Sequence, residues 1–136
     1  MKKIYTLLCL LLVCSSTYSC LENKQEATEV KLVTAAEMQS ILELEDVQLV
    51  DVRTPQEHEE MHIANSQNID FSSANFEEDI SKLDKKKPVI VYCKSGGRSS
   101  KCSKKMKDAG FEKVYDLEGG ISKWKHSDIL DIKVKS

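Results

Sequence analysis

The hydrophobic and polar positions along the chain switch between strand-like and helix-like patterns. Short, largely apolar runs predict strands at residues 47–52, 89–92 and 114–117, and a further short strand is expected at 66–69. Between them, apolar residues such as Phe76, Ile80 and Leu83 recur at helical spacing. The run at 89–92 is almost wholly apolar, which is expected of a strand covered on both faces of its sheet. Because strands and helices alternate, we predict a single α/β domain with a mainly parallel central sheet and helices on both faces.

Two capping boxes mark expected helix starts. Thr34 and Glu37 form the first, at the head of a helix that carries apolar residues at helical spacing. Thr54 and Glu57 form the second, and Pro55 takes the first helical position. Two further helices are expected over residues 99–109 and 121–125.

The first twenty residues follow a different pattern, that of a secretory signal. Lys2 and Lys3 precede an apolar run at 4–13, which is short for a bilayer span, and small residues then lead to Cys20. Small residues followed directly by Cys resemble the cleavage site of bacterial lipoproteins. We therefore expect a signal peptide at 1–19 and a lipid on Cys20 that anchors the protein outside the cytoplasm, facing the periplasm where a cell has two membranes. The alternative is an ordinary signal peptide and a soluble periplasmic protein.

Length and charge narrow the class of protein. The chain has 136 residues, a length that suits one domain. Its formal net charge of −2 argues against a nucleic-acid-binding protein, which usually carries a basic excess. We expect a polar tether at 20–30, the folded domain at 31–126 and a frayed C-terminal tail at 127–136.

The cysteines divide between the signal and the domain. Cys9 and Cys14 would leave with the signal, and lipid would block Cys20. Only Cys93 and Cys102 remain in the predicted domain, which is too few for a disulfide framework. A free thiol outside the cytoplasm is chemically vulnerable, so its presence calls for a functional explanation.

Cys93 is the candidate for that function. It is the first residue after the 89–92 strand, and ligands of parallel sheets bind beyond the carboxyl ends of the strands. The following loop comprises Lys94, Ser95, Gly96, Gly97, Arg98 and Ser99. Its glycines allow backbone N–H groups to turn inward, while the next helix's amino end and the two basic side chains add positive charge. We therefore predict a Cys93 thiolate near neutral pH, a nucleophile for anionic substrates. The alternative is a cysteine that merely packs in the core.

Four segments together resemble the single-domain rhodanese family. They are Val50–Arg53, Glu57–Ile69, Cys93–Ser99 and Phe111–Trp124. They occur in the family's order and cover about residues 31–126. The chain departs from the family pattern at Met61, where Gly is usual, and at Ala64 and Asn65, where Pro-Gly is usual.

The resemblance implies sulfurtransferase activity. Cys93 would take a sulfane sulfur from a small anionic donor such as thiosulfate and hold it as a persulfide. It would then pass the sulfur to a thiol, a protein acceptor or cyanide. The resemblance assigns the N–H groups of residues 94–99 to holding the anion, and Lys94 and Arg98 to the sulfonate of the donor. No metal or organic cofactor is implied.

Other chemistries compete with this interpretation. Four residues separate Cys93 from Arg98, whereas cysteine-dependent phosphatases have five, so the tighter loop favours sulfur over phosphate. A rhodanese fold can also serve as a persulfide carrier, a redox module or a protein-docking module without thiosulfate turnover. Cys102 would resolve an oxidised Cys93 in a redox role, although we favour its packing in the core.

Three further positions carry alternatives. Asp51 and Arg53 are either substrate contacts or an internal ion pair that supports the loops, and we favour the ion pair. His58 and His62 stand four residues apart, a spacing used by metal sites, but no third ligand is evident. We expect His62 to brace the loop that follows it.

Overall fold

The structure, a computed structural model, describes residues 29–136. The predicted signal peptide, Cys20 and most of the predicted tether lie outside the described residues. Within 29–136, no helix is both long enough and apolar enough to cross a bilayer.

Five parallel strands form the central sheet. In spatial order they are β1 (Val30–Val33), β6 (Val114–Leu117), β5 (Val89–Tyr92), β2 (Gln48–Asp51) and β4 (Gln67–Asn68). The four predicted strands are therefore confirmed. β1 was not predicted, and it begins at Val30, within the segment expected to be a tether.

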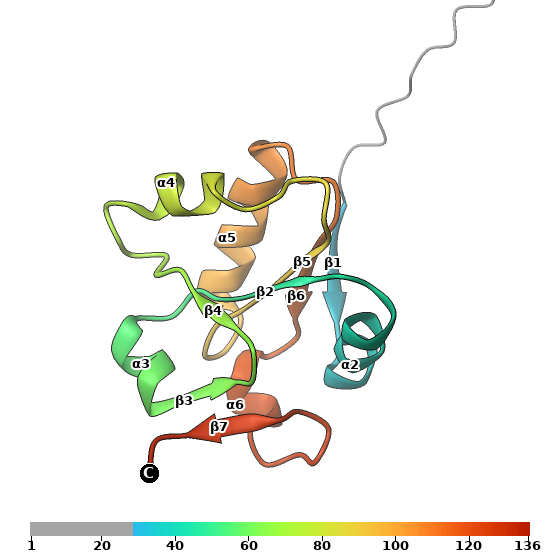
Figure 1. The fold of residues 1–136 in the computed structure, drawn as a ribbon, viewed down its shortest axis with the longest axis vertical. Coiled ribbons are helices and arrows are strands. Elements are labelled where there is room, and N and C mark those ends of the chain that lie inside the picture. Colours follow the sequence, from blue (N-terminus) through green and yellow to red (C-terminus); the bar gives the residue numbers. More distant parts are fainter. Residues whose placement is uncertain (1–28) are drawn as a thin grey trace, which may run out of the picture.

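Helices cover both faces of this sheet, as predicted (Figure 1). The helices are α2 (Ala35–Leu44), α3 (Pro55–Glu60), α4 (Phe76–Ser81), α5 (Gly97–Asp108) and α6 (Gly120–Trp124). α4 and α5 pack on one face, and α2 and α6 pack on the other. Both predicted capping boxes form, at Thr34 with Glu37 and at Thr54 with Glu57.

The alternation of side chains along β5 explains its continuous apolar run. Val89 and Val91 pack toward α4 and α5, whereas Ile90 and Tyr92 pack toward α2 and α6. All four residues are buried. Successive side chains of a strand point to opposite faces, so a strand whose two faces are both covered can be apolar at every position. The site at its carboxyl end therefore rests on a rigid support.

A second, two-stranded sheet lies beside the main one. β3 (Met61–Ile63) pairs antiparallel with β7 (Ile132–Val134). The prediction of a frayed tail at 127–136 was therefore wrong. Backbone hydrogen bonds join the C-terminal segment to β3. The Leu130 side chain packs in the core and is only 6% exposed, so it anchors this segment.

Candidate active site

The predicted Cys93 loop lies at the carboxyl end of β5 and leads directly into α5. Gly96 has a φ of 103°, in the left-handed region that glycine tolerates without strain, and it caps the helix. This turn directs the Gly96 N–H at Cys93, with 3.1 Å between the nitrogen and Sγ. The thiol is almost completely buried. Lys94, Ser95 and Gly97 are exposed, whereas Ser99 is fully buried beneath the loop.

The loop favours the anionic form of Cys93. Burial raises the pKa of this thiol. Hydrogen bonds from the Ser99 side chain and from the backbone N–H groups of Ser99, Gly96 and Ser95 lower it, and together they outweigh burial. The net effect is a Cys93 pKa below its usual value, which agrees with the predicted thiolate.

The start of α6 packs against the backbone of the same loop. The N–H of Ile121 donates to the Cys93 carbonyl at 2.9 Å, and the N–H of Ser122 donates to the Lys94 carbonyl at 3.0 Å. Gly120 makes this approach possible, because a Cβ there would lie 2.5 Å from the Lys94 carbonyl group. The sequence predicts the short helix at 121–125 but not its contact with the loop, for which Gly120 was the available signal.

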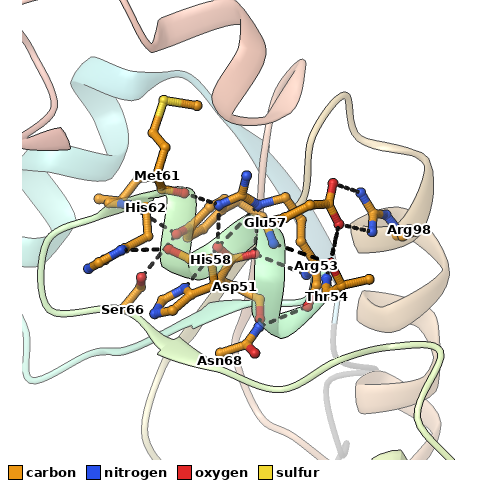
Figure 2. A network of polar contacts seen from close by, with 12 residues as sticks. Asp51, Arg53, Thr54, Glu57, His58, Met61, His62, Ser66, Asn68 and Arg98 are labelled. Carbon is orange, nitrogen blue, oxygen red and sulfur yellow. Dashed lines mark hydrogen bonds and ion pairs between the residues drawn. The ribbon is translucent and has the colours of Figure 1, made fainter. Parts of the chain in front are cut away.

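Arg98 forms an ion pair within the protein that the sequence did not predict. Its guanidinium forms a bidentate pair with the Glu57 carboxylate, at 2.7 and 2.8 Å (Figure 2). This pair, assisted by Thr54, lowers the pKa of Glu57 to about 2. The second capping box places Glu57 at the start of α3, where its carboxylate also accepts from Thr54. Arg98 is thus bound to protein in this structure and fastens α5 to α3 instead of presenting its guanidinium to a donor.

Asp51 and Arg53 form the internal ion pair that we favoured. Arg53 Nη2 lies 2.6 Å from Asp51 Oδ2 and 2.5 Å from the carbonyl oxygen of Met61 (Figure 2). Asp51 is fully buried and Arg53 is 3% exposed. Burial raises the pKa of Asp51, but hydrogen bonds from Arg53 and His58 outweigh burial and lower it. The pair holds the end of β2 against the start of β3.

The two histidines stack on each other beside this network. Their ring centroids are 4.2 Å apart, and His58 Nδ1 lies 3.0 Å from Asp51 Oδ2. His62 Nδ1 contacts the carbonyl oxygen of His58, so His62 braces the helix before it, not the loop after it. No group of three potential metal ligands occurs within residues 29–136.

Cys102 packs in the core, as favoured. It lies on the buried face of α5 with Met106, and its side chain is fully buried. Burial raises the pKa of its thiol to about 12. A thiol in this setting stays protonated and unreactive at neutral pH.

A groove of about 160 Å³ borders the loop. It is lined by Arg53, Glu57, Glu60, Met61, Lys94, Ile121, Ser122 and Lys125. Glu57 and Arg53 are held in the ion pairs described above. Among residues 29–136, neither Lys94 nor Lys125 has an acidic partner, so the groove carries two unpaired cations. Lys125 was not predicted as a site residue. Nothing in the neighbouring sequence marks it as one, apart from its position directly after Trp124.

Comparisons with known proteins agree with this arrangement. The rhodanese-like domain family model matches residues 34–127. The chain is 37% identical over 95 residues to the thiosulfate sulfurtransferase GlpE of Coxiella burnetii, covering 70% of this chain and 87% of the relative.

Solved structures show the same fold. A rhodanese-related protein from Thermoplasma volcanium superposes with a TM-score of 0.67 at 28% identity, over 78% of this chain and 99% of the other. A rhodanese-like domain protein from Staphylococcus aureus gives a TM-score of 0.64 at 30% identity, over 76% and 99%. The matched segment contains the whole Cys93 loop and its supports, and the chain belongs to the rhodanese-like domain family.

Proposed function

We propose that this protein is a sulfurtransferase that moves a sulfane sulfur from a donor such as thiosulfate to a thiol or cyanide acceptor through a Cys93 persulfide. Its relation to thiosulfate sulfurtransferases supports rhodanese-type sulfur transfer in general. The observation that carries the specific proposal is the loop N–H that donates to Cys93 Sγ at 3.1 Å. Hydrogen-bond donors around a buried sulfur stabilise its anionic form. The attacking thiolate and the persulfide are both sulfur anions, so the loop favours both.

The proposed cycle has two displacement steps. In the first, the Cys93 thiolate attacks the sulfane sulfur of thiosulfate and a new S–S bond forms. The S–S bond of thiosulfate breaks, and its electron pair leaves on sulfite. In the second step, the acceptor attacks the outer sulfur of the persulfide and the Cys93 thiolate leaves. No general base is needed in the first step once Cys93 is a thiolate, the form that the loop's hydrogen bonds favour.

We assign the anionic end of the donor to Lys94 and Lys125. Arg98 is engaged by Glu57, whereas these two lysines line the groove beside the loop without an acidic partner among the described residues. A dianion such as thiosulfate would be attracted by two cations in one groove. Glu60 also lines this groove; it forms no ion pair with any residue of 29–136, and it would repel an anionic donor.

A redox role through a Cys93–Cys102 pair is less well supported. The Cys102 thiol is fully buried and its pKa is raised to about 12, so it is a poor resolving thiol. A docking role is compatible with the fold, but it would not require the donors around Cys93 Sγ.

We also propose that the protein is a lipoprotein anchored through Cys20 outside the cytoplasm, with a secreted soluble form as the alternative. The support is the signal-like sequence of residues 1–20. Cells producing the full chain should incorporate labelled fatty acid into it, and the Cys20→Ser variant should incorporate none. Equal labelling of the two proteins would refute the anchor.

Turnover with thiosulfate and cyanide tests the activity. The full chain should produce thiocyanate, the Cys93→Ala and Cys93→Ser variants should produce none, and Cys102→Ala should retain most of the rate. Thiocyanate production that survives loss of Cys93 would refute the proposed nucleophile. Absence of turnover in the unmodified protein with both thiosulfate and polysulfide would favour docking.

A further inference from the structure

The lysines near the Cys93 loop differ from those elsewhere in the domain in their lack of acidic partners. Within residues 29–136, the lysines that pair with a carboxylate are spread over the fold, from Lys31 to Lys135. Those without such a partner that lie in the loop, in α5 or directly after α6 are Lys94, Lys101, Lys104, Lys107 and Lys125. Unpaired positive charge is therefore concentrated on the side of the molecule that carries the reactive cysteine.

Two of these lysines project from the outward side of α5. The residues of this helix that face the core are Ser99, Cys102, Ser103 and Met106. Gly97, Lys101 and Lys104 recur at helical spacing on the opposite side, and all three are exposed. We call these three residues, together with Lys94 in the loop, the lysine face.

The lysine face is unfavourable for the helix that carries it. Lys101 stands three residues from Lys104 and four from Lys105, and like charges at these spacings repel each other. The first turn of α5 has no acidic residue, although the helix dipole favours one there. Of the described lysines of α5, only Lys105 is paired, with Glu77 of α4. The whole chain has 22 acidic and 20 basic residues, so its composition does not impose a positive helix. An arrangement that opposes folding in this way points to a partner of opposite charge.

Gly97 leaves the lysine face open next to the reactive loop. A Cβ added at Gly97 would meet no atom within 4 Å, and its φ is not positive, so the backbone does not require glycine there. Cys93 is only 1% exposed, so an acceptor thiol has to enter the loop from its open rim. The absence of a side chain at Gly97 allows the backbone of a large acceptor to approach this rim.

We propose that the lysine face docks the sulfur acceptor, and that this acceptor is a protein thiol flanked by acidic residues. The inference rests on the proposed sulfur transfer and names the class of its acceptor. Acidic flanks pair with Lys101 and Lys104 while the acceptor cysteine enters the loop. Its thiolate attacks the outer sulfur of the Cys93 persulfide, and a new S–S bond forms on the acceptor. The S–S bond to Cys93 breaks and its electron pair returns to the Cys93 thiolate, so the acceptor leaves as a persulfide without gain or loss of a proton.

Single-turnover transfer from the full chain tests this proposal. The protein is loaded with thiosulfate, separated from excess donor and mixed with synthetic peptides that carry one cysteine flanked by glutamate, glutamine or lysine. Mass spectrometry follows the sulfur on each peptide. The glutamate peptide should accept sulfur roughly tenfold faster than the glutamine peptide at low salt, and this advantage should fade at about 0.5 M salt, because salt screens exposed charges.

Substitutions on the lysine face should change this preference. Lys101→Gln combined with Lys104→Gln should lose most of the advantage, and Lys101→Glu combined with Lys104→Glu should favour the lysine peptide. Both proteins should fold and retain thiocyanate production, because the substituted positions are exposed. The matched control is Lys85→Gln combined with Lys86→Gln. These exposed, unpaired lysines precede β5, at the opposite end of the sheet from Cys93, and their loss should leave the advantage intact.

Equal rates with the glutamate and glutamine peptides, or an equal loss in the control, would overturn the proposal. Vesicles of phosphatidylglycerol and of phosphatidylcholine test for a lipid partner. A preference of the full chain for the anionic vesicles that requires Lys101 and Lys104, without a preference among the peptides, would overturn it in favour of a membrane surface. Absence of thiocyanate from the unmodified protein would refute the proposed function itself, so the two failures are distinguishable.

Discussion

At the scale of single residues, the site depends on ion pairs that the local sequence does not reveal. Arg98 and Glu57 are 41 positions apart, and each has a local interpretation: Arg98 as an anion ligand and Glu57 as a capping residue. The capping role of Glu57 is confirmed, whereas the ion pair between Arg98 and Glu57 was not predicted. The difference arises because a capping box is a contact between residues three apart, whereas the Arg98 pair depends on how α3 and α5 pack.

We expect Glu57→Gln to reduce both stability and activity. The variant loses a bidentate ion pair and weakens the α3 cap, which should lower the free energy of unfolding by about 1–3 kcal/mol at pH 7. The folded-state pKa of Glu57 is about 2, below its usual 4.5, so its contribution is complete above pH 4.5 and is lost as pH falls toward 2. Urea unfolding at pH 7 and pH 3 should show a smaller difference at pH 3.

The matched control is Glu59→Gln on the same helix. Glu59 forms an exposed pair with Lys135, and such pairs contribute little, ~0–1 kcal/mol. Equal loss in the two variants, or a difference that grows as pH falls, would contradict the role given to Glu57.

We expect Asp116→Asn to stabilise the protein at neutral pH. The folded-state pKa of Asp116 is about 6, above its usual 3.8, so the folded state is penalised as pH rises from about 4 to 6. Removing the buried charge should raise the free energy of unfolding by about 1–3 kcal/mol at pH 7.5 and change it little at pH 4. Urea unfolding at the two pH values measures this, and a loss of stability at pH 7.5 would count against an ionised, poorly solvated Asp116.

At the scale of elements, hydrophobic patterns predicted the central strands, and capping boxes predicted the starts of α2 and α3. β5 was predictable because all four of its residues are buried. β1 and β7 were missed because they are only four and three residues long and each exposes two of them, so neither segment is long enough to show a strand pattern. The Cys93 loop was predictable because its glycines, cysteine and following helix are contiguous in sequence. The packing of α6 against that loop was not predictable, because it depends on contacts between residues that are far apart in the sequence.

We expect Gly120→Ala to displace α6 from the loop. A Cβ at Gly120 would lie 2.5–2.6 Å from backbone atoms of Lys94 and Cys93, and backbone has little freedom to move away. Gly120→Ala should lower the free energy of unfolding by about 2–4 kcal/mol and also lower the rate of thiocyanate production.

Gly110→Ala is the control for backbone strain alone. Gly110 also has a positive φ, of 91°, but no atom lies within 4 Å of its added Cβ. Gly110→Ala should lower the free energy of unfolding by only about 1–2 kcal/mol and leave the thiocyanate rate per folded molecule unchanged. If both variants lost the same rate, the contact of α6 with the loop would have no catalytic importance.

At the scale of the whole molecule, the chain end closes the fold beside the site. β7 pairs with β3, and the Met61 carbonyl at the start of β3 accepts from Arg53. The C-terminal segment thus supports, through β3, the network that holds the end of β2. Its position next to this network was invisible in the sequence, where residues 127–136 match no family pattern.

We expect deletion of residues 131–136 to destabilise the domain by about 1–3 kcal/mol, because β3 loses its backbone partners. Val134→Ser, which alters a side chain that is 69% exposed, should change stability little. Thermal unfolding of both proteins measures the difference. Equal stability of the truncated and intact chains would show that the tail is frayed in solution.

The central claim is that Cys93 carries sulfur as a persulfide, and the intact mass of the full chain after exposure to thiosulfate tests it most directly. We expect a gain of one sulfur atom that cyanide removes, present in Cys102→Ala and absent in Cys93→Ala. No gain from thiosulfate or polysulfide, with Cys93 still reduced, would contradict the claim. A loss of two hydrogens that depends on both cysteines would also contradict it and would point to a dithiol redox role.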